Sequence, residues 1–419
     1  MPASSLQRRV AVALAAVFFF GPAGAYAVGV RPVAIENRPL RSLPGISAGW
    51  SFFAQTSAWA IDQLPLRDQA VRGNVNLSEG VFGQPPSYGG SGDTGPVSAP
   101  RSVPVQQDEN AASGAYAQIL QGSDGWLYLG TDVSGACQPL MTVPQVLARL
   151  ERLARAVQRS GRRFVFTIAP DKTTVWPANL PANYVGKGCA SARKEEFWSA
   201  LRADPPPGYF DMRGAIEARQ AETGQPQYWP GDTHWAQWAA ATYAEKLAGN
   251  VDPDGFAPLP ISCAGTVTRV GDLTVYSGAP RADTMPACRI DTPQRPITGI
   301  LTDVPGVTVP TFTGTPTRVS ARYGTGTGLD PVRANTLLLG DSFSIIARPY
   351  VLPLFGRLTV QHIEQARYSP RAVANAMVRA DVVAYEIVER AVIRGGQALL
   401  SDTALAAVER ALAAHPRRH

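Results

Sequence analysis

The chain contains few histidines and few charged residues for its length. Only four histidines occur in 419 residues, and His415 and His419 lie in the basic C-terminal segment, so a histidine base inside a fold must be His234 or His362. Charged residues make up 17% of the chain and no run of lysine or arginine exceeds two, which argues against a nucleic-acid partner. With 45% hydrophobic residues, this composition excludes wholesale disorder and predicts a globular protein with a sizeable core.

The sequence also lacks the patterns of common cofactor sites. It has no P-loop, no dinucleotide-binding glycine fingerprint and no cluster of residues at metal-ligand spacing, so we expect neither a cofactor nor a metal. Its four cysteines, Cys137, Cys189, Cys263 and Cys288, are too widely spaced for a zinc knuckle. Their even number fits two disulfides in an oxidising compartment. Of the three possible pairings we expect the one that joins neighbours in the sequence.

Residues 1–30 have the pattern of an export signal. Arg8 and Arg9 precede an apolar stretch from Val10 to Phe20, and small residues at Ala25 and Ala27 follow it. We predict cleavage after Ala27, which makes residues 1–27 a signal peptide. The alternative is an uncleaved signal anchor, because this segment is apolar enough to cross a bilayer. In either case the body of the protein is exported.

Composition divides the rest of the chain into segments. Residues 28–81 include apolar positions at helical spacing from Trp50 to Val75 and are predicted to form a helical cap. Residues 82–113 are rich in glycine, serine and proline, cannot bury enough apolar surface to become ordered, and are predicted to be a flexible insertion. Residues 114–419 form the predicted main domain, in which residues 251–333 are an irregular, β-rich insertion rich in proline, glycine, threonine and valine.

From Gly122 onward, short apolar strands alternate with helical patterns, which is typical of a parallel sheet covered on both faces. The predicted strands are 125–129, 163–169, 209–212, 336–339, 358–363 and 381–388. The predicted helices are 144–160, 192–201, 213–221, 235–248, 344–355, 370–378 and 403–413. The fold class is therefore α/β, a doubly wound parallel sheet with flavodoxin-like layering. Ligands bind such sheets beyond the carboxyl ends of the strands, where Ser342, Asp171 and Glu389 are expected.

Ser342 directly follows the apolar strand, at a Gly340–Asp341–Ser342 turn that opens a helix. This position exposes Oγ and leaves backbone N–H groups free at the helix start, where they can hold an oxyanion. Asp232 and His234 are two residues apart, so the carboxylate can reach Nδ1 and leave Nε2 to accept a proton from a hydroxyl. Ser342, His234 and Asp232 are thus the predicted nucleophile, base and orienting carboxylate.

Each of these assignments has a structural alternative. Gly-Asp-Ser also forms ordinary turns, and Ser344 is the nearest rival nucleophile, although we expect it to cap the helix. Asp232 or Thr233 is expected to be the N-cap of the helix that follows. In the alternative to the catalytic interpretation, Asp232 only caps this helix and His234 packs against neighbouring tryptophans. His362 lies inside an apolar strand and is a weaker candidate for the base.

Four further residues are candidates for substrate binding. Lys172 follows a strand at the same edge of the sheet, where a cation can bind a substrate carboxylate or support an oxyanion; the alternative is a solvated loop lysine. Arg348 and Arg371 are cationic candidates of the same kind. Trp235 can stack on the apolar face of a sugar ring, and the alternative is a core tryptophan. The net charge of +6 favours an acidic substrate, such as a polyanionic glycan, or an anionic membrane surface.

Several short motifs occur together in this chain. They are Glu36–Arg38, Gly122–Tyr128, Ala169–Lys172, Gly231–Trp235, Gly271–Leu273, Gly340–Ser344 and Tyr385–Arg390. In combination the chain resembles the SGNH-hydrolase-like polysaccharide O-acetyltransferases of the alginate type, the AlgJ/AlgX-like proteins of bacterial periplasms. In that family the Asp-x-His pair precedes the serine, the reverse of ordinary SGNH esterases, and this chain has the same order. The resemblance assigns the same roles to Ser342, His234 and Asp232.

The resemblance implies a periplasmic O-acetyltransferase, with residues 114–419 as its SGNH-like catalytic domain. Such an enzyme moves acetyl to hydroxyls of an exported polysaccharide through an acetyl-serine. It also implies two partners: a membrane-bound O-acyltransferase that delivers the acetyl donor, and an inner-membrane export complex. Two alternatives stay open, namely a secreted carbohydrate esterase with the same triad and a non-catalytic glycan-binding subunit. The segment 82–113 departs from the family pattern, and the identity of the polysaccharide is not specified.

Overall fold

The computed structural model describes residues 116–291, 297–304, 307–316 and 332–417. The predicted signal peptide or anchor, the helical cap and the insertion at 82–113 lie outside the described residues. Residues 275–280 belong to a second compact unit, and the account below concerns the larger unit. Within the described part of the chain, no helix has both the length and the apolar character needed to cross a membrane.

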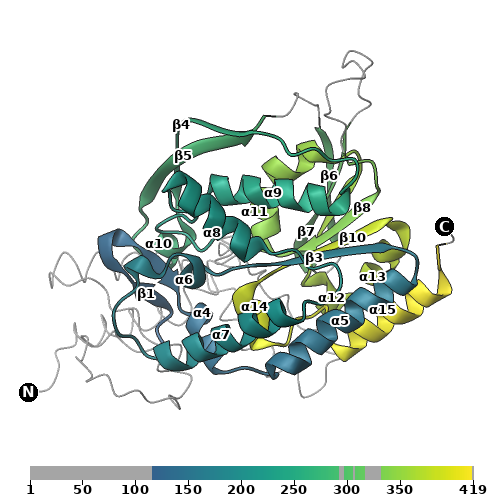
Figure 1. Cartoon of the computed structure of the whole chain (residues 1–419), viewed down its shortest axis with the longest axis horizontal. Helices are drawn as coiled ribbons and strands as arrows, with labels where there is room; N and C mark the ends of the chain where they lie inside the picture. The colour runs from purple at the N-terminus through teal and green to yellow at the C-terminus, as the bar shows by residue number, and fades with distance from the viewer. Residues whose placement is uncertain (1–115, 292–296, 305–306, 317–331, 418–419) are drawn as a thin grey trace, which may run out of the picture. The chain divides into compact units, whose positions relative to one another are not determined.

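A six-stranded mixed sheet forms the centre of the larger unit (Figure 1). Its order is β3 (Arg163–Ala169), β10 (Val382–Val388), β8 (Thr336–Gly340), β9 (Leu358–His362), β7 (Val307–Pro316) and β6 (Ile297–Val304). The first four strands are parallel, whereas β7 and β6 continue the sheet in antiparallel pairing. From β8 the chain goes first to β9 on one side and then to β10 on the other. The topological switch point, where doubly wound sheets bind ligands, therefore lies between β8 and β10.

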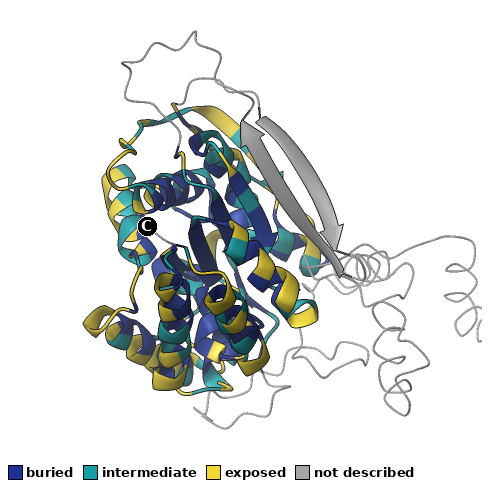
Figure 2. Cartoon of the chain, turned by 90° about the vertical axis from the view of Figure 1, so that its right-hand side faces the viewer, coloured by how far each residue is buried: buried dark blue, intermediate teal, exposed yellow. Residues whose placement is uncertain are grey.

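Helices cover both faces of this sheet. Figure 1 shows α8 (Met212–Thr223), α9 (Gln237–Val251) and α11 (Ser342–Val351) on one face, and α5 (Val143–Arg159), α13 (Pro370–Arg379) and α15 (Asp402–Ala414) on the other. The central strands β8 and β10 are buried along their whole length, as the dark strands of Figure 2 show. Such continuous burial is typical of parallel strands with helices on both faces. The predicted doubly wound α/β class is confirmed.

The remaining elements are smaller and surround this three-layer core. They are β1 (Ile119–Gln121), β2 (Leu127–Leu129), α4 (Thr131–Cys137), α6 (Lys172–Val175), α7 (Lys187–Ala203), β4 (Ile261–Val270), α10 (Asp272–Tyr276), β5 (Ala282–Ile290), α12 (Gln365–Tyr368), α14 (Glu389–Arg394) and the 3₁₀ turns Ser123–Gly125, Pro177–Asn179 and Leu352–Leu354.

Two predicted strands differ from the structure. In the segment 125–129 only β2 is a strand, and it pairs with β1 in a separate two-stranded sheet. The segment 209–212 forms no strand, because Tyr209 makes a single bridge to Phe166 before α8 begins. The β-rich character predicted for 251–333 is found in its described residues, where β4 and β5 form a separate two-stranded sheet and β6 and β7 extend the main sheet.

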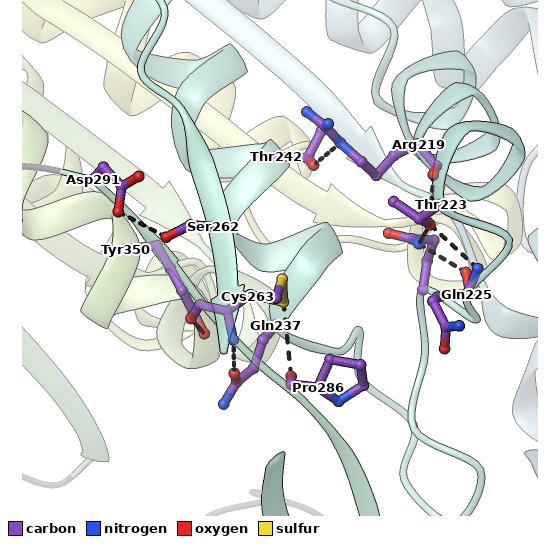
Figure 3. The surroundings of a disulfide bond; sticks show 12 residues. Arg219, Thr223, Gln225, Gln237, Thr242, Ser262, Cys263, Pro286, Asp291 and Tyr350 are labelled. Carbon is purple, nitrogen blue, oxygen red and sulfur yellow. Dashed lines mark hydrogen bonds between the residues drawn. A yellow bond between two sulfur atoms is a disulfide. The ribbon is translucent and has the colours of Figure 1, made fainter. Parts of the chain in front are cut away.

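Two disulfides pair the cysteines as expected, Cys137 with Cys189 and Cys263 with Cys288. The second joins facing residues of β4 and β5. Gln237 of α9 and Tyr350 of α11 reach toward this disulfide from the main domain (Figure 3). The Oε1 of Gln237 accepts a hydrogen bond from the backbone N–H of Cys288 at 2.6 Å, and the Tyr350 hydroxyl donates to the Cys288 carbonyl at 3.2 Å. The hairpin is thereby tied to the two helices that flank the switch point.

Candidate active site

Ser342 is the first residue of α11, and only Asp341 separates it from the end of β8. The Asp341 carboxylate fixes this turn: one oxygen accepts from the backbone N–H of Phe343 at 2.9 Å and the other from that of Val388 at 2.7 Å. Gly340 is required here, because a Cβ would lie 2.3 Å from the hydroxyl of Ser344. The N–H of Ser342 stands at the first position of the helix, where no preceding turn supplies a carbonyl acceptor.

The structure brings together the three residues predicted to form the triad. The His234 Nε2 lies 2.8 Å from the Ser342 Oγ, although the two residues are 108 apart in the sequence. On the other side of the ring, Nδ1 lies 2.7 Å from the Asp232 Oδ1. The imidazole also packs against the Phe343 ring, with centroids 5.0 Å apart. Ser342 is half-buried whereas His234 and Asp232 are buried, so the hydroxyl is the most accessible member of the chain of hydrogen bonds.

The carboxylate of Asp232 is held by four donors. Its Oδ1 also accepts from the His234 backbone N–H at 2.9 Å, and its Oδ2 accepts from the Arg269 guanidinium at 3.0 Å and from the Asp272 backbone N–H at 3.1 Å. Burial alone would raise the pKa of Asp232, but the hydrogen bonds and charges of His234 and Arg269 outweigh it and lower the pKa to about 2. The orienting carboxylate is therefore ionised at neutral pH.

The loop that carries Asp232 and His234 is braced by residues from two further elements. Asp272, at the start of α10, accepts from the Thr233 backbone N–H at 2.7 Å and also from the Thr233 hydroxyl. Asp283 of β5 accepts from the Gly231 backbone N–H at 2.6 Å. These bonds satisfy the polar groups of a buried, non-helical segment, which is the condition for keeping such a segment in one conformation.

Lys172 does not face a substrate, contrary to our prediction. Its side chain is 2% exposed, and Nζ donates to the backbone carbonyls of Trp229, Pro230 and Asp232 at 3.0, 3.0 and 2.8 Å. Burial lowers the pKa of Lys172 to about 7, an effect that the nearby carboxylates, first of all Asp232, oppose. The ammonium therefore binds the backbone of the loop that carries Asp232 and His234.

Trp235 is also unavailable to a sugar, contrary to our prediction. It is fully buried and its ring lies between those of Tyr243 and Phe343, at centroid distances of 4.9 and 5.0 Å. Arg348 is half-buried, and its Nε donates to the Ile345 carbonyl of its own helix at 2.9 Å. Arg371 is exposed in the first turn of α13. Substrate binding by these two arginines stays a prediction.

Ser344 does not cap α11, contrary to expectation, because the cap is Asp341. Ser344 is buried instead. Its hydroxyl donates a hydrogen bond to the Glu386 Oε2 at 2.7 Å, and a second hydrogen bond of 2.8 Å joins it to the Tyr243 hydroxyl. Burial is the main reason why the pKa of Glu386 is raised well above its ordinary value. This network lies beneath the turn that presents Ser342.

Two other sequence interpretations are corrected by the structure. The N-cap of α9 is Ala236 and has no side-chain hydrogen bond, so the capping role predicted for Asp232 or Thr233 is wrong. Their side chains are used within the loop. His362 ends β9, and its Nδ1 accepts a hydrogen bond from the Glu364 backbone N–H at 3.2 Å. The imidazole within hydrogen-bond distance of the Ser342 hydroxyl is that of His234.

Three residues that complete the site have no role predicted from the sequence. Asp341 and Asp272 stand in motifs of the sequence, whereas Arg269 lies in the predicted insertion, where no local pattern marks it. Asp232, His234 and Asp272 form a group whose potential metal-ligand atoms lie within 4.8 Å of one another. However, each carboxylate oxygen of this group already accepts at least one N–H or O–H of the protein. The group is a hydrogen-bond network that positions the imidazole.

A buried cluster of charges occupies the ends of β3 and β10 behind this site. Arg390 donates to Asp171 at 2.7 Å, and the Lys194 ammonium lies 3.7 Å from Asp171 and 3.5 Å from Glu389. The guanidinium of Arg390 stacks over the Phe343 ring at 5.5 Å. Asp171 and Glu389 do gather at the predicted edge of the sheet, but as a buried ion-pair network.

Comparison with known proteins identifies relatives of this chain. A family model described as the SGNH hydrolase-like domain of the acetyltransferase AlgX matches residues 119–351. The probable alginate O-acetylase AlgJ of Pseudomonas aeruginosa is 24% identical over 163 residues, and that of Pseudomonas syringae pv. tomato is 23% identical over 168 residues. Each alignment covers 38% of this chain, and the chain spans only 39% and 41% of the length of these two relatives.

Two solved structures of other proteins are similar to part of this chain. The O-acetyltransferase domain of Pseudomonas putida AlgJ is 18% identical, with a TM-score of 0.44 over 70% of this chain and 98% of that one. Bacillus cereus PatB1 is 14% identical, with a TM-score of 0.46 over 68% of this chain and 99% of that one. Because the family model matches more than half of the 419 residues and includes the Asp-x-His pair and the serine, the chain belongs to the AlgJ/AlgX-like family of SGNH hydrolase-like acetyltransferases.

Proposed function

We propose that this protein transfers acetyl groups to hydroxyls of a polysaccharide through an acetyl-Ser342 intermediate. The observation that carries the proposal is the unbroken series of hydrogen bonds from Asp232 through His234 to Ser342. A serine hydroxyl becomes an effective nucleophile when a neighbouring imidazole accepts its proton and a carboxylate holds that imidazole in the right tautomer. Each of these requirements is met here by a buried or half-buried side chain.

In the first half-reaction, the Ser342 Oγ attacks the carbonyl carbon of the acetyl donor while its proton passes to the His234 Nε2. The bond to the leaving group then breaks, and the leaving group takes that proton. In the second half-reaction, a sugar hydroxyl gives its proton to His234 and attacks the acetyl-serine. The Ser342 oxygen leaves and recovers the proton, so the enzyme is regenerated and the acetyl is on the sugar.

Two features of the site favour these steps. The ionised carboxylate of Asp232 stabilises the imidazolium that forms each time His234 takes a proton. The N–H of Ser342 at the start of α11 is a candidate donor to the oxyanion, and a donor of this kind typically contributes about 3 kcal/mol to the transition state. A protonated His234 cannot accept the serine proton, so the rate should fall toward acid pH.

The surroundings of the reaction form part of the proposal. We infer an exported polysaccharide as acceptor, a periplasmic location, and an acetyl donor supplied by a membrane-bound O-acyltransferase of an export complex. The relatives that the chain matches are described as probable alginate O-acetylases, which supports a polysaccharide acceptor. The net charge of +6 is compatible with an acidic polymer.

Incubation of the purified protein with p-nitrophenyl acetate, with and without oligosaccharide acceptors, tests the proposal. Wild type should form acetylated sugar, and mass spectrometry of the quenched enzyme should find acetyl on the peptide that contains Ser342. Ser342→Ala should lose both products, whereas Ser199→Ala, which changes an exposed serine of α7, should keep them. Faster release of acetate from an acetylated glycan than transfer to an acceptor would identify an esterase instead. Equal results for wild type and Ser342→Ala would identify a non-catalytic subunit.

A further inference from the structure

In the described part of the chain, the buried Lys172 and the largely buried Lys194 lie near the active site, and their partners differ in kind. Lys194 lies within 3.7 Å of the carboxylates of Asp171 and Glu389, which is an ordinary buried ion pair. Among the residues described, the hydrogen bonds of the Lys172 ammonium go to backbone carbonyls alone, and all three belong to residues 229–232. An ammonium buried without a directly bonded carboxylate is expensive, so its place calls for an explanation.

The carbonyl groups bound by Lys172 lie in the segment that sets the position of the base. One of them is the carbonyl of Asp232, whose side chain orients His234. Trp126 and Tyr128 cover the ammonium from the other side, with ring centroids 5.5 and 5.2 Å away. A neutral side chain would leave the Asp232 carbonyl buried without this donor, and rotation of the peptide that follows would relieve the penalty. That rotation would move Asp232 and His234 together.

We propose that Lys172 is a positioning residue for acetyl transfer: by holding the carbonyls of residues 229, 230 and 232, its ammonium keeps His234 within hydrogen-bond reach of Ser342. This inference rests on the proposed function for its chemistry, but the geometry that it describes is independent of the substrate. Lys172 touches neither the nucleophile nor the base. Its effect is to keep the loop in the one conformation in which Nε2 faces the serine.

The same contact predicts a pH dependence. The carboxylates that face Lys172 are Asp232 in the loop, Asp272 in α10, Asp132 in α4 and Asp283 in β5, and they favour the ammonium, whereas burial opposes it and lowers its pKa to about 7. Loss of the proton removes the charged donor, so the carbonyls are held less tightly. The rate of wild type should therefore decline on the alkaline side of that pKa in addition to its decline in acid.

The test compares Lys172→Met, Lys172→Arg and Lys194→Met with wild type. We expect Lys172→Met to lower kcat for p-nitrophenyl acetate by about 100-fold with little change in KM, which is the loss typical of a reacting group displaced by about 1 Å. Lys172→Arg, which stays charged, should retain more activity and lose the alkaline decline. Lys194→Met, the matched control, removes a buried lysine of the ion-pair cluster and should lower the melting temperature while the shape of the pH profile is kept.

Two further measurements do not depend on acetyl transfer. The rate at which phenylmethanesulfonyl fluoride sulfonylates the Ser342 oxygen, with loss of fluoride and transfer of the proton to His234, should fall in Lys172→Met as kcat does. The downfield NMR proton of the His234 Nδ1 should weaken or shift in the same variant. If wild type neither transfers nor hydrolyses acetyl, the proposed function fails, and these two measurements still decide the role of Lys172.

The inference is overturned if folded Lys172→Met loses no more kcat than Lys194→Met, or if its His234 Nδ1 proton is that of wild type. If Lys172→Met does not fold, the pH dependence of kcat in wild type and in Lys172→Arg, together with the NMR signal of the His234 Nδ1 proton, decides the role of Lys172. An Nδ1 proton of wild type that weakens in parallel with the alkaline loss of kcat supports the proposal. The proposal is contradicted if the NMR signal of this proton stays unchanged while kcat falls. It is also contradicted if Lys172→Arg keeps the decline of kcat at alkaline pH.

Discussion

Asp232→Asn is expected to lower both the stability and the activity of this protein. The substitution keeps the shape of the side chain and removes its charge. In the folded protein the pKa of Asp232 falls from an ordinary 3.8 to about 2, chiefly through His234 and Arg269, which outweigh the opposing effect of burial. A difference of nearly two pKa units corresponds to about 2 to 3 kcal/mol of stability, because each unit contributes roughly 1.4 kcal/mol.

The sign of this contribution sets its pH dependence. A carboxyl whose pKa is depressed in the folded state stabilises the fold above the unfolded value and loses that effect as the pH falls through the folded value. The free energy of unfolding of wild type should therefore exceed that of Asp232→Asn by about 2 to 3 kcal/mol at neutral pH, and this difference should narrow between pH 3.8 and about 2. Urea denaturation at a series of pH values measures it.

The catalytic effect follows from the four donors around the carboxylate. The amide of asparagine has one acceptor oxygen and one donor NH₂. It therefore cannot accept hydrogen bonds both from the two N–H groups of His234 and from the donors of Arg269 and the Asp272 backbone. If its NH₂ faces His234, the ring proton moves to Nε2, which then cannot accept the proton of Ser342. Loss of the correct tautomer in this way lowers kcat by about 10⁴-fold in a serine triad.

Steady-state kinetics with p-nitrophenyl acetate measure this loss, and Asp272→Asn is the matched control. Asp272 lies 3.4 Å from Nδ1 and hydrogen-bonds to Thr233, so its amide should lower kcat far less. A value of kcat for Asp232→Asn within about tenfold of wild type, in protein shown to be folded, would refute the assignment of Asp232 as the orienting carboxylate.

Two further predictions concern the structural support of the site. In Gly271→Ala, the added Cβ would lie 2.0 Å from the Gly231 carbonyl, so we expect the loop to shift and kcat to fall by more than about tenfold while the protein stays folded; a normal kcat would show that the loop tolerates this shift. Replacing Cys263 and Cys288 by serine opens a link across a separation of 25 residues, so urea denaturation should show a loss of about 3 kcal/mol, and an unchanged midpoint would contradict this.

The triad was predictable from the sequence because its constraints are local. Asp232 and His234 stand two residues apart, which places the carboxylate within reach of the imidazole in one tight turn. Ser342 follows a strand with three consecutive leucines and opens a helix, so its hydroxyl had to stand at the carboxyl edge of the sheet. With only four histidines in the chain, few bases were left to consider.

The failures share a physical cause as well. Trp235 and Lys172 were assigned to a substrate surface from their positions next to strands and turns, yet both are buried. Local patterns place a residue on an element but do not say whether its side chain faces solvent or the inside of a neighbouring loop. That depends on which segments pack against it, and here those segments come from distant parts of the chain.

By itself, the amino-acid sequence determined the α/β class, the strands that carry the site and the three residues predicted to form the triad, since periodicity and residue chemistry act over a few neighbouring positions. Only the tertiary structure decided that Arg269 and Asp272, which belong to the predicted insertion, hold the carboxylate of Asp232, and that Lys172 donates hydrogen bonds to the backbone of the loop that carries Asp232. Such contacts join residues many positions apart, and their geometry arises only when the sheet, the hairpin of β4 and β5 and the loop pack together.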